Sequence, residues 1–257
     1  MKQGQSKVFL VTGNENLRNK DVFLESLLYH QKLKKENPLL VNLMPNHGVF
    51  TGAPKKRDRK SPLPDFFDYY TDLDIPCITR ERLAGELQGK NREELLALGD
   101  SFSTTILLGV PPHESNPFYH RLDDCIDHIV FLIKNDYESS SYLFHVLNEQ
   151  YEKIIEKNLG IIISGIRRVE DAARFFVEIR DEMRELIDAS LAFDYLGHLE
   201  YNINRITFAK KRGSVYLKLF ENDSFHGAIK YIDEKLEGME HFRTKSFFRT
   251  LADLVQD

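Results

Sequence analysis

The chain has 257 residues, and 42% of them are apolar, so it is long enough and apolar enough to bury a core of its own. Its 35 Lys and Arg against 40 Asp and Glu give a formal net charge of -5, which argues against a broad attraction to nucleic acid or anionic lipid. No segment approaches the roughly 18 apolar residues of a transmembrane helix, and the apolar run near the N-terminus is too short for a signal peptide, so we expect a cytoplasmic protein.

Short runs of apolar or β-branched residues recur along the chain, and each is typical of a buried strand. They are VFLVT (8–12), PLLVNL (38–43), STTILLGV (103–110), HIVFLI (128–133), LGIIIS (159–164) and FDYLGHL (193–199). Longer segments with helical spacing separate them, and in 20–35 and 142–154 the apolar residues recur on one helix face. Strands that alternate with helices predict an α/β protein with a doubly wound, predominantly parallel sheet flanked by helices.

The segment from Gly52 to Asp100 differs from the rest because it is polar, basic and broken by prolines near its start. We expect a surface excursion here. The basic run GAPKKRDRKSPLPD is typical of a solvated loop, although an acidic partner could contact it. The aromatic cluster that follows is expected to hold a short helix on the sheet; it consists of Phe66, Phe67, Tyr69 and Tyr70.

The first apolar run ends at Gly13, and the sequence GNENLRNKD stands where a phosphate-binding loop would begin. Such a loop, G-x-x-x-x-G-K-[ST], uses glycines to direct backbone N–H groups at the phosphate, a lysine for charge and a hydroxyl for Mg²⁺. Here the second glycine, the lysine and the hydroxyl are missing. A shift of one residue brings Lys20 near the lysine position but puts Asp21 in place of the hydroxyl, and Glu15 adds a charge that repels a polyphosphate.

A purely structural interpretation of the same loop is also open. Asn14, Asn16 and Asn19 tolerate the backbone of a strand-to-helix turn, and Asp21 would be favoured by the dipole at the start of the next helix. The loop would then need no ligand. We expect no cofactor, and no closely spaced set of ligand side chains predicts a metal site.

Taken in order, four segments resemble the motifs of the MinD/ParA class of deviant P-loop ATPases. VFLVTGNENLRNK stands at the phosphate loop, PLLVNLMPNHGVF resembles the second-strand motif, STTILLGVPPHESNP the third-strand motif, and HIVFLIKNDYESSSYLFHVL the segment after the next strand. The ending LAFDYLGHLEYNINRITFAKKRGSVYLKLFENDSFHGAIKYIDEKL is most similar to the flagellar number regulator family FlhG, also called FleN or YlxH. The resemblance implies a P-loop NTPase-like fold of the MinD/ParA type.

At the positions that carry chemistry in that family, the sequence departs from the pattern. By resemblance, the signature lysine that crosses the dimer falls at Asn14, and the loop lysine falls at Asn19, or at Lys20 after the shift. The water-positioning aspartate falls at Asn42 and the Mg²⁺-binding aspartate at Gly109. Phosphoryl transfer would lose both positioning and electrostatic stabilisation, which implies a pseudo-ATPase. The degenerate positions of the nucleotide site are Gly13, Asn14, Asn19, Lys20, Asp21, Asn42 and Gly109.

The segment after Gly238 carries one apolar stripe at helical spacing, flanked by Arg and Lys. We predict a MinD/FlhG-like α/β domain over 1–237 and a C-terminal amphipathic helical tail over 238–257. The tail could dock on a partner or on the inner face of the membrane, or it could pack on its own domain. The docking side chains would be Phe247, Phe248, Leu251 and Leu254.

The preferred hypothesis is an FlhG-like pseudo-ATPase that acts as a binding or scaffolding protein in flagellar number or placement control. It would bind a protein partner and no nucleic acid, and it would be a monomer or an ATP-independent dimer. Two alternatives stay open. One is a weak nucleotide hydrolase that uses Lys20 and an unrecognised carboxylate, and the other is a ParA- or MinD-like partitioning or cargo-positioning protein.

Overall fold

A computed structural model describes residues 7–14, 17–44, 67–69, 75–80, 82–83, 92–99, 101–109, 122–240 and 246–254. Contacts divide the chain into two compact units. Unit 1 comprises residues 1–10, 31–127 and 241–257, and unit 2 comprises residues 11–30 and 128–240. The first strand, β1 (Lys7–Thr12), and the first helix, α1 (Leu17–Leu33), have residues in both units.

Unit 1 contains a short, mainly parallel sheet. β2 (Pro38–Asn42) pairs in parallel with β4 (Pro76–Thr79) on one side and with β5 (Thr104–Leu108) on the other. β3 (Asp68–Tyr69) pairs antiparallel with β4. Every residue of β2 and β5 is buried, as expected for parallel strands that are covered on both faces.

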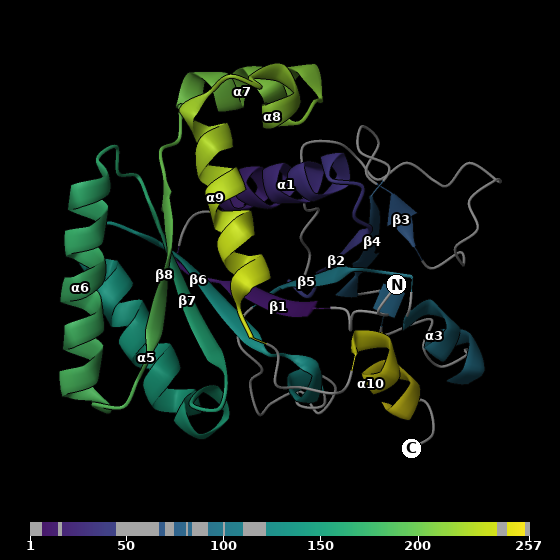
Figure 1. The fold of residues 1–257 in the computed structure, drawn as a ribbon, viewed down its shortest axis with the longest axis horizontal. Helices are drawn as coiled ribbons and strands as arrows, with labels where there is room; N and C mark the ends of the chain where they lie inside the picture. The colour runs from purple at the N-terminus through teal and green to yellow at the C-terminus, as the bar shows by residue number, and fades with distance from the viewer. Residues whose placement is uncertain are drawn as a thin grey trace. The chain divides into compact units, whose positions relative to one another are not determined.

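Unit 1 also contains α3 (Arg92–Gly99), the 3-10 helix η2 (Asp123–Cys125) and α10 (Phe247–Leu254). α10 lies beside α3 and also contacts η2 (Figure 1). A helix from the C-terminal end of the chain therefore covers an element formed by residues 92–99.

The apolar stripe of the C-terminal tail is buried within unit 1. Phe247, Phe248 and Leu251 are 1%, 2% and 0% exposed, and the Phe248 ring stacks on the Phe102 ring with centroids 5.5 Å apart. This arrangement corresponds to the alternative in which the stripe packs on its own domain, and docking through these side chains would require α10 to leave unit 1. The docking role and the domain boundary after residue 237 stay predictions, and the Leu254 side chain lies outside the described residues.

Part of the segment expected as a surface excursion belongs to the core of unit 1. β4 lies within it, and Cys77 and Ile78 of this strand are 2% and 0% exposed. The expectation failed because the burial of so short a strand comes from its pairing with β2. Of the aromatic cluster, Phe67 is buried, and its ring centroid lies 6.3 Å from that of Phe248 on α10. Phe66, Tyr70 and the side chain of Tyr69 lie outside the described residues, so the expectation that the cluster holds a short helix on the sheet stays a prediction. The basic run lies outside the described residues.

Unit 2 contains three parallel strands in the order β6 (His128–Lys134), β7 (Asn158–Ser164) and β8 (Phe193–Leu199). The crossover helices α5 (Tyr137–Ile154) and α6 (Val169–Leu186) connect them and pack on each other. β6 and β7 are almost wholly buried, which explains their continuous apolar sequences.

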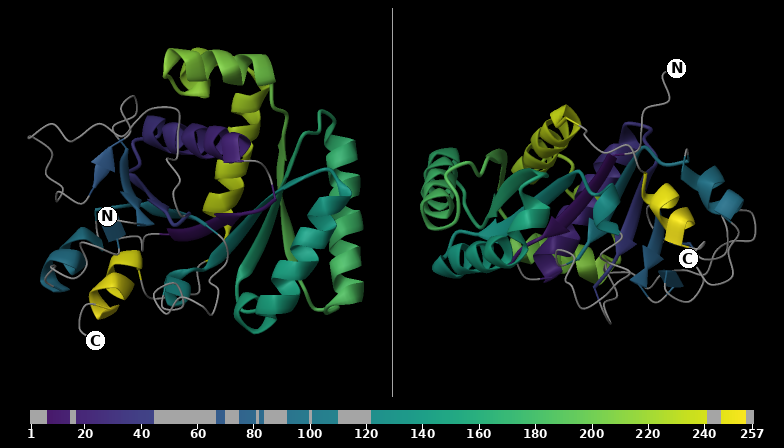
Figure 2. Two further views of the ribbon diagram at one scale, coloured as in Figure 1. Left: turned by 180° about the vertical axis from the view of Figure 1, so that it is seen from behind. Right: turned by 90° about the horizontal axis from the view of Figure 1, so that it is seen from below.

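After β8 the chain forms α7 (Ile203–Arg212), α8 (Tyr216–Leu219) and α9 (Ser224–Gly238). α9 runs along β8. α7 and α8 lie together near the N-terminal end of α9 (Figures 1 and 2). α9 buries Phe225, Ile229 and Ile232 along the sheet, so it contributes to the core of unit 2.

The predicted fold class is confirmed: the protein is α/β, with a predominantly parallel, doubly wound sheet flanked by helices. All six apolar runs contain strands, namely β1, β2, β5, β6, β7 and β8, and the two predicted helices correspond to α1 and α5. Within the residues that the structure describes, no helix has the length and apolar character needed to cross a membrane.

Candidate functional site

The loop after β1 begins with a glycine for which the structure provides a steric reason. Gly13 has a φ of +142°, and a Cβ atom at this position would lie 1.9 Å from the carbonyl oxygen of Leu132 on β6. Both the backbone conformation and the close approach require glycine. The packing of unit 2 therefore accounts for Gly13 whether or not a phosphate ever binds.

Asn14 binds the corner between β6 and α5. Its side-chain oxygen accepts a hydrogen bond from the backbone N–H of Lys134 at 3.3 Å, and its side-chain nitrogen donates to the Ser139 hydroxyl at 2.9 Å. The backbone N–H of Ser139 also donates to Asp136, which caps the start of α5. The residue at the signature-lysine position is thus engaged within its own unit.

A second contact joins the end of β1 to α5. The hydroxyl groups of Thr12 and Tyr142 lie 2.7 Å apart. Burial raises the pKa of Tyr142, although its hydrogen bond with Thr12 opposes the shift. The phenol therefore stays protonated at neutral pH, and together with Asn14 it fixes the position at which the loop leaves the strand.

Lys20 faces the backbone of the loop. Its side chain is buried, and its ammonium group donates to the Gly13 carbonyl at 2.5 Å. The neighbouring Asn19 is half-buried and cannot supply a positive charge. Asp21 is buried as well, but α1 begins at Leu17 and has no acidic residue in its first turn. The interpretation of Asp21 as a charge at the start of the helix is therefore wrong.

The two remaining predicted positions, Asn42 and Gly109, belong to unit 1, whereas the other five belong to unit 2. Asn42 is 1% exposed, and its side-chain oxygen accepts a hydrogen bond from the backbone N–H of Met44 at 3.0 Å. A Cβ atom at Gly109 would lie 3.2 Å from the Cβ of Leu43. Both residues shape the ends of buried strands, and neither carries an ionisable group.

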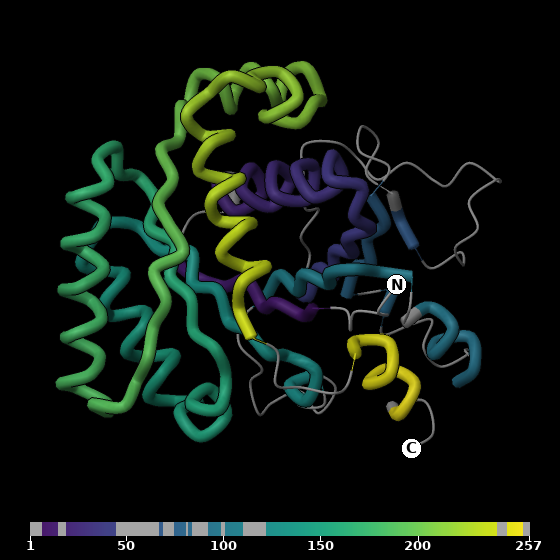
Figure 3. Tube along the Cα trace, viewed as in Figure 1, coloured from purple at the N-terminus to yellow at the C-terminus, as the bar shows by residue number. Residues whose placement is uncertain are grey.

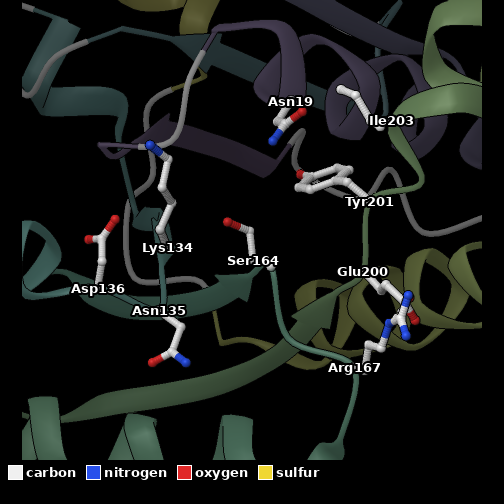
Figure 4. Close-up of a pocket in the computed structure, with 10 residues that line it drawn as sticks. Asn19, Lys134, Asn135, Asp136, Ser164, Arg167, Glu200, Tyr201 and Ile203 are labelled. Carbon is white, nitrogen blue, oxygen red and sulfur yellow. Dashed lines mark hydrogen bonds and ion pairs between the residues drawn. The ribbon is translucent and has the colours of Figure 1, made fainter.

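A cavity of about 480 Å³ opens at the carboxyl ends of β6, β7 and β8 (Figure 4). Ligands of open α/β sheets bind at this edge of the strands. Figure 4 shows the side chains of Lys134, Ser164 and Tyr201 around the same open space. The described lining residues are Asn19, Lys134, Asn135, Asp136, Ser164, Gly165, Arg167, Glu200, Tyr201 and Ile203.

Three of the four charged groups of this cavity have partners. Asp136 accepts the backbone N–H of Ser139 at 3.1 Å, and Glu200 forms an ion pair with Arg167 at 2.6 Å. The ammonium group of Lys134 forms no ion pair with any described residue. The cavity therefore presents an ammonium group and a helix-capping carboxylate, neither in an ion pair with a described residue, among amides and hydroxyls.

The described lining of the cavity offers amide, hydroxyl, ammonium and carboxylate groups and includes neither His nor Cys. In the part of the chain that the structure describes, no group of three or more His, Cys, Asp or Glu side chains could hold a metal ion.

The sequence alone did not identify the residues at the ends of β6, β7 and β8. Lys134 is the last residue of β6, Ser164 is the last residue of β7, and Tyr201 follows β8. The rule that parallel strands present ligand-binding residues at their carboxyl ends could have selected all three. The D-x-x-S spacing of Asp136 and Ser139 likewise signals a helix cap.

No protein-family model and no curated protein sequence matches the chain. Solved structures do match. The MinD cell division protein of Aquifex aeolicus aligns with a TM-score of 0.61 over 93% of this chain and 100% of that chain, at 12% identity. A ParA family ATPase from Chlorobium tepidum TLS gives 0.60 over 92% and 100%, at 13% identity. These similarities show that the chain has the P-loop NTPase fold of the MinD/ParA class.

One further neighbour corrects the expectation about nucleic acid. A structure of pNOB8 ParA bound to nonspecific DNA aligns with a TM-score of 0.56 over 91% of this chain and 100% of that chain, at 11% identity. A protein of this fold therefore binds DNA. The expectation that this chain binds no nucleic acid, which was based on its net charge, is wrong. Net charge averages over the whole surface, whereas phosphate contacts need only a local group of Lys and Arg.

Proposed function

We propose that this chain is a scaffolding protein of MinD/ParA fold that binds protein partners without hydrolysing ATP. The observation that carries the proposal is the engaged loop after β1. The ammonium group of Lys20 donates to the Gly13 carbonyl, and Asn14 binds Lys134 and Ser139. Side chains at or next to the family's lysine positions are therefore committed within unit 2.

The chemistry of phosphoryl transfer supports the same proposal. By resemblance, Asn42 and Gly109 stand where carboxylates position the water and Mg²⁺, and Asn42 is used by the adjacent backbone. Loss of a single electrostatic group from an active site typically lowers kcat by about 10²- to 10³-fold. Loss of several such groups favours a binding role over the alternative of a weak hydrolase.

The biological process is proposed from two kinds of similarity. The sequence resembles FlhG through its ending, which supports a role in flagellar number or placement control. The structural neighbours are MinD/ParA-type partitioning ATPases, which supports a second candidate, a positioning protein for another cargo. Both candidates share a fold that recruits partners, and they differ only in the partner.

Isothermal titration calorimetry and light scattering with millimolar ATP and Mg²⁺ test the proposal. We expect no saturable heat and no change in mass, because the loop offers a polyphosphate neither a free lysine nor a hydroxyl. Saturable heat, or a doubling of mass that depends on ATP, would overturn it.

A restored loop supplies the matched variant. Asn14→Lys, Arg18→Gly, Asn19→Lys and Lys20→Thr together recreate the second glycine, the two lysines and the hydroxyl of the family loop. Lys20→Met serves as the control that only removes the ammonium group. If the restored protein binds ATP and the natural chain and the control do not, these positions account for the loss of ATP binding. ATP binding by the Lys20→Met control would instead show that the lysine masks a working site, which contradicts the proposal.

A further inference from the structure

We propose that α7 and α8 form a docking surface for anionic lipid. This inference goes beyond the scaffolding role and does not depend on the state of the nucleotide loop. After β8 the chain folds into these two helices before it returns along the sheet as α9 (Figure 3). Residues 203–220 contain five cations and no acidic residue, in a chain whose net charge is -5. The five cations are Arg205, Lys210, Lys211, Arg212 and Lys218.

The end of α7 brings three of these cations together. Gly213, with a φ of +61°, donates its backbone N–H to the Lys210 carbonyl at 3.0 Å and ends the helix in a left-handed turn. Lys211 and Arg212 are exposed beside this turn. Cations at this end also complement the helix dipole, but that role does not account for the exposed Lys218 on α8.

Most of this positive charge is uncompensated. Arg205 forms an ion pair with Asp223, which also accepts a hydrogen bond from Tyr216 at 2.6 Å. Among the residues that the structure describes, none forms an ion pair with the other four cations. The α7–α8 surface therefore attracts anions although the chain as a whole is acidic.

Exposed apolar side chains stand among the cations. Ile203, Phe208 and Leu219 are 55%, 46% and 38% exposed. The Phe208 ring lies 6.2 Å from the Phe220 ring, and the Arg212 guanidinium lies 5.3 Å from the Phe208 centroid. Apolar and positively charged groups are thus adjacent on the same surface.

This combination selects anionic lipid over nucleic acid. DNA phosphates require cations and hydrogen-bond donors, and exposed aliphatic side chains add little to such contacts. A lipid interface provides anionic headgroups together with a hydrocarbon boundary that accepts Phe, Leu and Ile side chains. The α7–α8 surface would then attach peripherally and reversibly, since few apolar side chains are available for insertion.

Co-sedimentation of the full chain with vesicles tests the proposal. We expect binding to phosphatidylcholine vesicles that contain phosphatidylglycerol, no binding to phosphatidylcholine alone, and weaker binding as salt is raised. Lys210→Gln with Lys211→Gln should lower the partition coefficient roughly 25-fold, because each cation near an anionic surface contributes about fivefold. The matched control, Lys230→Gln with Lys235→Gln on exposed positions of α9, should change it less than about twofold.

The variant Phe208→Ser distinguishes lipid binding from DNA binding. Leu219→Ser replaces it if Phe208→Ser lowers the melting temperature. Each should weaken vesicle binding while leaving any binding of duplex DNA unchanged. Failure of the natural chain to bind anionic vesicles would overturn the proposal, and DNA binding without vesicle binding would identify a nucleic-acid surface instead. An equal loss in the α9 control would show a general charge effect and would also overturn it.

Discussion

α10 and α7 are both short amphipathic helices that carry aromatic and basic residues, yet their aromatic side chains meet different surroundings. Phe247 and Phe248 of α10 are at most 2% exposed within unit 1, whereas Phe208 of α7 is 46% exposed in unit 2. The helix with the clearer apolar stripe is the one whose stripe is covered. A stripe shows only that one face avoids water, and the surrounding fold determines whether its own domain or a partner covers that face.

The largest expected effect is the loss of an aromatic ring from α10. Phe248→Ala should lower the free energy of unfolding by about 3–5 kcal/mol, because the ring is fully packed against Phe102 and Phe67. Phe208→Ala should cost less than about 1 kcal/mol, since nearly half of that side chain already meets water. Urea denaturation followed by circular dichroism measures both. Equal losses would remove the distinction between the two helices.

An intermediate effect on the free energy of unfolding is expected at Asp223, which joins α7 and α8 to α9 through hydrogen bonds. Asp223 caps α9 through the backbone N–H of Phe225 and accepts hydrogen bonds from Tyr216 and Arg205. Asp223→Ala should cost about 1–3 kcal/mol, because a cap and a charged hydrogen-bond acceptor are lost together. Hydrogen exchange over 203–220 should accelerate. Asp181→Ala, which removes an exposed surface ion pair, is the control and should leave that exchange unchanged.

Acid should produce a smaller change of the same kind. Burial raises the pKa of Asp223, but hydrogen bonds from Tyr216, Arg205 and Phe225 outweigh it and hold the pKa below its usual value of 3.8. A carboxyl group with a lowered pKa stabilises the fold above its unfolded pKa, and this stabilisation is lost as the pH falls through the folded pKa. Proteolysis of the α7–α8 surface should therefore accelerate only below about pH 4, and Asp223→Ala should remove this dependence. Faster cleavage at neutral than at acid pH would contradict it.

The smallest effect is expected at the rim of α10. Arg92 of α3 and Asp253 of α10 lie 3.6 Å apart, with side chains 42% and 40% exposed. Arg92→Ala should shift the free energy of unfolding by less than about 0.5 kcal/mol, because water screens exposed ion pairs. Thermal unfolding measures the shift. A loss as large as that of Phe248→Ala would mean that charge, and not aromatic packing, holds α10 in place.

Much of the fold could be predicted because its strongest signals are local. Buried parallel strands produce continuous apolar runs, and β6 and β7 show them over most of their length. β4 could not be found in this way, since four residues within a polar segment become a core strand only through pairing with β2. The covering of α10 likewise depends on Phe67 and Phe102, which are remote in sequence.

The candidate site divides in the same way. The missing lysine and hydroxyl of the loop are visible in a few consecutive residues, so their loss could be recognised from the sequence. The contacts of Asn14 could not, because Ser139 lies 125 residues further along the chain and becomes a neighbour only when β1 and α5 meet within unit 2. The cavity arises at the aligned ends of three strands, and its lining residues are divided among the last residues of β6 and β7 and the short segments that follow all three strands.

The discontinuous chain path of unit 1 has a consequence during synthesis. Residues 31–127 emerge from the ribosome before residues 128–240, but α10 emerges after them and supplies the cover for Phe102 and α3. The nascent chain therefore carries an uncovered aromatic surface while unit 2 is being translated. This surface is a natural target for chaperones that bind exposed apolar segments, and a pause in translation before α10 would prolong the interval in which the chain can aggregate.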